Sequence, residues 1–156
     1  MYPKKYTPSQ NKEYITRWCA KSERAPLEVK RKLQSRGMSA QDAEAVVVEL
    51  EETGFVDADR FAVAYTRDKY RFNKWGERKI HASLSALGID EGIIVRALEE
   101  IDRETYIENL RGLYAAKMRR VKTPDDREAR MKCFGYLLGR GYTADDIRRV
   151  EEEWKR

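Results

Sequence analysis

One short pattern recurs along this chain and constrains its fold more than any other feature. A leucine, any three residues, a glycine, an apolar residue and a helix-capping residue follow one another at Leu33–Ser39, Leu84–Asp90 and Leu137–Thr143. Glycine ends helices because it adopts positive φ without strain, and Ser, Asp or Thr caps the helix that follows. The pattern therefore predicts three separate helix–turn–helix junctions.

Apolar residues surround each pattern at matching positions. Four residues before the leucine stand Val29, Ile80 and Cys133. Four and seven residues after the cap stand Ala43 and Val46, Ile94 and Ala97, and Ile147 and Val150. This helical spacing predicts buried stripes, and one small unit cannot bury its apolar face alone. We therefore expect an all-α fold, a tandem array of three three-helix repeats that is elongated and curved.

The repeats have predicted boundaries. Residues 1–11 are polar and contain prolines and lysines, so we expect a flexible basic arm there. The three repeats then cover 12–54, 55–102 and 103–156. Pro26 is well placed to begin the second helix, and Gly54 to end the third.

Composition limits the possible functions. Charged residues make up 38% of the chain, and the formal net charge is +5, which permits a nucleic acid or an acidic protein as partner. The first residues contain no apolar run, and no apolar stretch is long enough to span a bilayer. We expect a cytoplasmic monomer with no membrane partner.

The sequence contains no arrangement of residues that indicates an enzyme. His81 is the single histidine, so a catalytic triad would have to use it, and a surface or capping role suits it better. Cys19 and Cys133 lie far apart and are expected to be buried thiols, with no metal site. Asp57 and Asp59 are read as helix caps. No glycine-rich phosphate loop occurs, so no cofactor is expected.

The central segment resembles the RecX family, bacterial regulators of the RecA recombinase. The shared residues are Gly54-Phe55-Val56-Asp57, Asp59-Arg60-Phe61-Ala62, Tyr65, Lys74-Trp75-Gly76, Lys79-Ile80, Leu84, Gly88-Ile89 and Ala97-Leu98. Trp75 and Glu77 depart from the family, which commonly has a small residue or proline beside this glycine. The resemblance implies tandem three-helix units, binding in the groove of the RecA filament on DNA, and inhibition of strand exchange and ATP turnover.

Charge is unevenly distributed. The segment Ser39–Thr53 carries Asp42, Glu44, Glu49, Glu51 and Glu52 but no lysine or arginine. In a helix-turn-helix protein this segment would enter the major groove, where its carboxylates would repel phosphates. Sequence-specific reading of DNA by these helices is therefore disfavoured.

Basic residues gather instead between the first two helices of the later repeats. We expect a surface that contacts DNA phosphates or an acidic face of the filament, made of Arg67, Lys69, Tyr70, Arg71, Lys74, Trp75, Arg78, Lys79, Arg119, Arg120 and Lys122. Tyr70, Phe72 and Trp75 either stack on unpaired bases of single-stranded DNA or pack between repeats. The alternative function is non-specific DNA binding with no recombinase partner.

Overall fold

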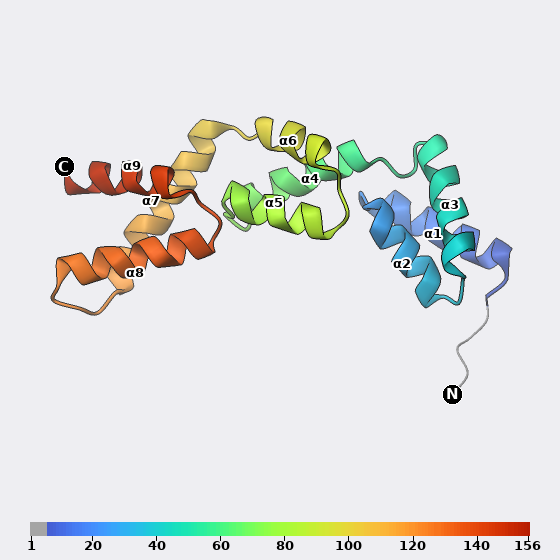
Figure 1. The fold of residues 1–156 in the computed structure, drawn as a ribbon, viewed down its shortest axis with the longest axis horizontal. Helices are drawn as coiled ribbons and strands as arrows, with labels where there is room; N and C mark the ends of the chain where they lie inside the picture. Colours follow the sequence, from blue (N-terminus) through green and yellow to red (C-terminus); the bar gives the residue numbers. More distant parts are fainter. Residues whose placement is uncertain (1–5) are drawn as a thin grey trace. The chain divides into compact units, whose positions relative to one another are not determined.

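The protein is all-α. The computed structural model describes residues 6–156, and no strand occurs among them (Figure 1). The helices are α1 (Pro8–Lys21), α2 (Pro26–Ser35), α3 (Ala40–Glu52), α4 (Ala58–Arg71), α5 (Glu77–Ala86), α6 (Glu91–Glu99), α7 (Arg103–Arg120), α8 (Asp126–Gly139) and α9 (Ala144–Lys155). The prediction of an all-α fold of three-helix repeats is confirmed.

The helices group into two compact units. The first contains the chain up to Ala64 together with Leu84–Val95, and the second contains Tyr65–Ser83 together with Arg96–Arg156. The segment 55–102, predicted as the middle repeat, therefore contributes residues to both units. We describe each unit by itself.

The first unit has a core of small apolar side chains from α1, α2 and α3. Ile15, Val29, Leu33 and Ala43 are completely buried. The predicted flexible arm over 1–11 is too long, because α1 begins at Pro8. The cause is a capping box, in which Thr7 Oγ1 accepts from Gln10 N at 3.1 Å and Gln10 Oε1 accepts from Thr7 N at 2.9 Å. Residues 1–5 lie outside the described part of the chain.

The predicted glycine turns are confirmed. Gly37, Gly88 and Gly141 have φ of 93°, 78° and 99°. At each turn the N–H of the following residue donates to the carbonyl of the repeated leucine, at 3.2 Å in Met38–Leu33, 3.1 Å in Ile89–Leu84 and 3.2 Å in Tyr142–Leu137. These are Schellman-type helix ends, so the repeated pattern encodes one turn three times.

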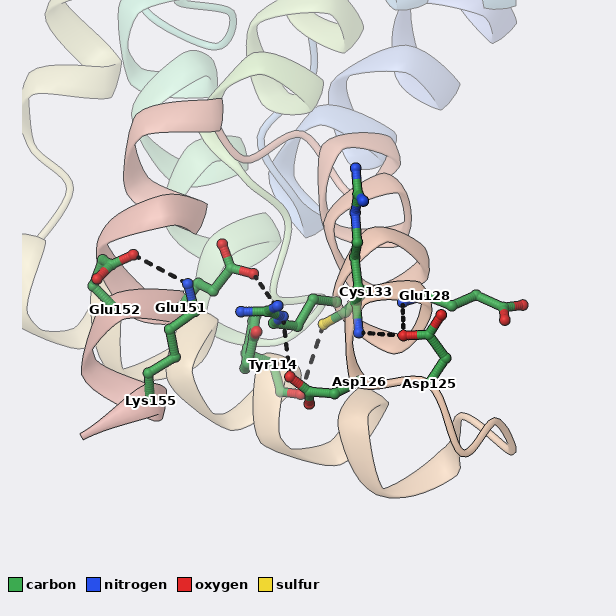
Figure 2. Close-up of polar contacts among 10 residues, drawn as sticks. Tyr114, Asp125, Asp126, Glu128, Cys133, Glu151, Glu152 and Lys155 are labelled. Atoms are coloured by element: carbon green, nitrogen blue, oxygen red, sulfur yellow. Dashed lines mark hydrogen bonds and ion pairs between the residues drawn. The ribbon is translucent and has the colours of Figure 1, made fainter.

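The second unit has a core that contains large tyrosines. Tyr106, Tyr114 and Tyr142 are almost completely buried, and the rings of Tyr106 and Tyr142 lie 5.2 Å apart. Cys133 is also buried and donates a weak hydrogen bond to the carbonyl of Tyr114 at 3.8 Å (Figure 2). Cys19 and Cys133 are both free and buried, as expected. Burial raises the pKa of the Cys133 thiol to about 11.

Candidate functional site

Helix α4 carries the first part of the predicted basic surface. Asp57 caps it, because its Oδ1 accepts from Arg60 N at 2.9 Å. Phe61 and Ala62, near the beginning of this helix, are buried. Lys69 and Arg71 lie in the last turn, where the helix dipole stabilises positive charge.

The loop 72–76 connects α4 to α5 in a strained but well-supported conformation. Lys74 has φ of 53°, the only positive φ among the described residues other than glycine. Trp75 N donates to Lys69 O at 3.1 Å, a bond that spans one residue more than the corresponding bonds of the glycine turns. Lys74 lies three residues after the end of α4, whereas the turn glycines lie two residues after their helices. Tyr142 Oη donates to Lys74 O at 2.8 Å, and Arg140 donates to the carbonyls of Asn73 and Lys74.

Two glycines pin this loop to the turn between α8 and α9. Gly76 N donates to Arg140 O at 2.8 Å, and Arg78 N donates to Gly141 O at 3.0 Å. A Cβ added at Gly76 would lie 2.2 Å from the backbone carbon of Gly141. The backbones therefore cross at a distance that only glycine permits, and the loop is fixed to the core of the second unit.

Trp75 lies between two lysines. The Nζ atoms of Lys69 and Lys79 lie 4.7 Å and 4.5 Å from the centre of the indole. Lys69 is also 5.3 Å from the ring of Tyr65. Such cation–π contacts hold long side chains in place without neutralising their charge. Trp75 is half-buried, so it supports the loop and is still partly open to solvent.

Few carboxylates form ion pairs with the basic side chains of α4, the loop 72–76 and α5 in the described part of the chain. Glu77 accepts from Arg103 at 2.8 Å and is therefore already paired. Asp68 lies 3.9 Å from Arg67, and both side chains are more than half exposed, so this pair is weak. The pKa of Asp102 lies below its usual value, mainly because the Thr105 hydroxyl donates to it, with a smaller contribution from Arg71. The surface keeps an excess of positive charge.

Aromatic exposure differs from the prediction. Tyr70 is only 2% exposed, so the expected contact through Tyr70 is wrong, whereas Phe72 is 79% exposed. Tyr70 follows Ala62 and Thr66 at intervals of four residues, which places it on the inner face of α4. That spacing was visible in the sequence. Phe72 lies beyond the end of α4, where periodicity no longer applies.

The structure separates the predicted basic residues into two clusters. Arg67, Lys69, Arg71, Lys74, Arg78 and Lys79, with Phe72 and Trp75, form what we call the α4–α5 cluster. Arg119, Arg120 and Lys122, all exposed, form the α7 cluster. Asn109 marks where α7 meets the first cluster, since its side chain contacts Tyr70 O and Lys74 Nζ. Arg120 lies about 16 Å further along the helix, at about 1.5 Å per residue.

Other kinds of site find no support in the part of the chain that the structure describes. No group of His, Cys, Asp and Glu side chains there could hold a metal ion. His81 is half-buried on α5. None of the described helices is long and apolar enough to cross a membrane.

Comparison with known proteins gives a consistent result. Models of the second and third three-helix domains of RecX match residues 59–98 and 104–150. Regulatory protein RecX of Stenotrophomonas maltophilia is 30% identical over 148 residues, covering 95% of this chain and 87% of that protein. Regulatory protein RecX of Clostridium acetobutylicum is 32% identical over 130 residues, covering 81% of this chain but 60% of that protein.

A solved structure shares the fold. The crystal structure of RecX from Lactobacillus salivarius superposes with a TM-score of 0.82 at 22% identity, covering 93% of this chain and 94% of that one. The family models and the relative from Stenotrophomonas maltophilia confirm the resemblance to the RecX family, and the solved structure confirms the fold. The shared name is that of a regulatory protein, in agreement with the expectation that the chain is not an enzyme.

Proposed function

Because the chain belongs to the RecX family, we propose that it binds a RecA-type recombinase filament on DNA and restrains its ATP turnover and strand exchange. The observation that carries this proposal is the family relationship, which extends over most of the chain. The activity is a regulatory one, exerted by binding. The protein acts in the cytoplasm as a monomer.

The α4–α5 cluster is the contact surface in this proposal. Arg71, Lys74 and Arg78 are exposed, and Lys69 and Lys79 are held on the ring of Trp75. A surface that is rigid before binding loses little conformational entropy when it meets its partner. Its cations suit DNA phosphates or an acidic face of the filament, and Phe72 and Trp75 suit unpaired bases.

A second function is favoured by the same cluster. Exposed cations beside an exposed aromatic are also what a non-specific single-strand-binding protein uses. In that case the protein would act on a recombinase only by occupying its DNA. Binding to free DNA would then occur at the same concentrations as inhibition.

A charge-reversal variant tests the site. We expect Arg71→Glu, Lys74→Glu and Lys79→Glu together to abolish inhibition of the recombinase's DNA-dependent ATP hydrolysis while helicity by circular dichroism is kept. The matched control reverses three exposed cations elsewhere, at Lys21, Arg31 and Arg149, with the same change in net charge. Full inhibition by the first variant would refute the site. An equal loss of inhibition in both variants would show that net charge, and not this site, is responsible.

A further inference from the structure

A row of alternating aromatic rings and cations lies along α1, α2 and the residues that flank these helices in the first unit. Arg36 Cζ lies 3.7 Å from the ring centre of Tyr6 and 3.9 Å from that of Tyr14. Lys32 Nζ lies 5.8 Å from Tyr14 and 5.7 Å from Trp18, and Arg24 Cζ lies 4.0 Å above Trp18. We call Tyr6, Arg36, Tyr14, Lys32, Trp18 and Arg24 the stacked row.

Helical spacing explains the row. Tyr14 and Trp18 are four residues apart on α1, so they share one face of that helix. Lys32 lies on α2, and Arg36, four residues later, is the residue that caps the end of this helix. The two helices pack against each other in the first unit (Figure 1). Because both pairs have the same interval, each of these two cations falls beside a ring of α1.

In the described part of the chain, the cations of the row are not engaged in ion pairs. Among residues 6–156, no carboxylate forms an ion pair with Arg24, Lys32 or Arg36, although other basic side chains of this unit are paired. The two nearest acids in sequence are engaged elsewhere. Glu23 accepts from Arg60 Nε at 2.6 Å, and Glu28 accepts from Ala25 N at 3.2 Å.

The guanidinium groups keep donors available. Stacking uses the faces of a guanidinium, whereas its five N–H donors lie in its plane. Arg36 Nε donates to Asn11 Oδ1 at 2.9 Å, and Arg24 Nε donates to Trp18 O at 3.3 Å. Each of these bonds fixes a guanidinium through its Nε atom. The edge that carries the two Nη atoms is then available to donate to two oxygens of a phosphate.

We propose that the stacked row is a second anion-binding surface, distinct from the α4–α5 cluster, that holds the phosphodiester backbone of a nucleic acid strand without reading its sequence. Lys32 and Arg36 are one helical turn apart in a single line, a placement that fits a polymer with regularly repeated charge. The rings hold the cations in position, and the contact with the strand is through its phosphates. The proposal does not depend on any recombinase.

Salt dependence of binding provides the test. A fluorescein-labelled oligothymidylate is titrated with the full chain at several salt concentrations, with no recombinase present. Replacing Arg24, Lys32 and Arg36 by Gln should weaken binding about tenfold or more at low salt. It should also make the negative slope of log K against log salt shallower by about 2, since each of the three lost single-strand phosphate contacts contributes about 0.7.

The matched control stays on the same two helices. Arg17, Lys21 and Arg31 are exposed outside the row, so replacing them by Gln makes the same charge change and should leave the slope within about 0.7 of the wild type. Equal slopes in the two triple variants would overturn the proposal. The proposal would also be overturned if the row substitutions weakened the binding of polyglutamate but left the binding of the oligonucleotide unchanged. That result would assign the row to an acidic protein.

A second measurement uses the unaltered protein and so does not depend on how a variant folds. Lysine acetylation is followed by mass spectrometry with and without the oligothymidylate. Lys32 should be protected at least severalfold, and Lys21, exposed on α1, should not. Unchanged acetylation of Lys32 at saturating oligonucleotide would overturn the proposal.

Discussion

At the scale of single residues, the candidate surface depends on two glycines whose backbones touch. Gly76 N donates to Arg140 O, and a Cβ at either Gly76 or Gly141 would lie within 2.4 Å of an atom of the other segment. A side chain there cannot be accommodated by rotating a neighbour, because the opposing atoms include backbone. The loop and the α8–α9 turn would have to separate.

Alanine at Gly76 should therefore destabilise the protein by about 2–4 kcal/mol, measured by urea unfolding. Gly112 provides the control, because it lies inside α7 and an added Cβ meets nothing within 4 Å. Gly112→Ala should instead stabilise by about 0.5–1 kcal/mol, since alanine favours helix. A tolerated Gly76→Ala change would show that the backbones are not in contact.

Lys74 gives a different prediction, because its strain and its charge act on different properties. Its positive φ costs a non-glycine residue about 1–2 kcal/mol. Lys74→Gly should raise the free energy of unfolding by about 0.5–1 kcal/mol and weaken binding to the filament or to DNA. Lys74→Asn, which tolerates positive φ but lacks the charge, should weaken binding to a similar extent. Loss of stability in the glycine variant would contradict the account.

Phe72, and not Tyr70, is the aromatic residue exposed for contact with a partner, and Tyr70 belongs to the core. Phe72→Ala should change stability by less than about 0.5 kcal/mol, because the ring is exposed, yet weaken single-strand binding severalfold. Tyr70→Ala should cost about 3–5 kcal/mol, because a buried ring is removed. Thermal unfolding and an oligonucleotide titration of both variants separate the two effects. Unchanged binding by Phe72→Ala would remove that residue from the site.

At the scale of helices and turns, local patterns predicted the elements well and their assembly less well. The Leu33, Leu84 and Leu137 turns followed from glycine chemistry, and the buried stripe of α3 from its apolar spacing. The crossing of Gly76 with Gly141 did not, because contact between segments so far apart has no local signature. The separate positions of the α4–α5 and α7 clusters depend on such contacts too.

The tyrosine core of the second unit makes its stability sensitive to alkaline pH. Burial raises the pKa of Tyr106, Tyr114 and Tyr142 above the ordinary value of 10.0. The unfolded chain releases these protons first, so their contribution is complete below pH 10.0 and decreases as pH rises toward the folded pKa values.

We therefore expect tyrosinate absorbance to rise in two steps during an alkaline titration. Tyr106, Tyr114 and Tyr142 account for the second step, in which they ionise together with the loss of helical circular dichroism. Tyr142→Phe should reduce the amplitude of the second step. A single step that is complete before any loss of helix would contradict the burial of these rings.

At the scale of the whole molecule, charge is divided between acidic and basic surfaces. The carboxylates of α3 are exposed, and Glu44 and Glu49 are paired with Lys30 and Lys12. Positive charge collects in the α4–α5 cluster, the α7 cluster and the stacked row. The expectation that α3 does not read the major groove stands as a prediction, and the basic surfaces give a polyanion several places to bind.

The proposed target of the protein is a recombinase filament and not free DNA. The most direct test measures DNA-stimulated ATP hydrolysis by the host's RecA-type recombinase on single-stranded DNA near physiological salt. The protein is added far below one copy per recombinase, and binding to free DNA is measured alongside. We expect inhibition at concentrations too low to cover the DNA. Inhibition only once the DNA is saturated would contradict it and favour simple competition for DNA.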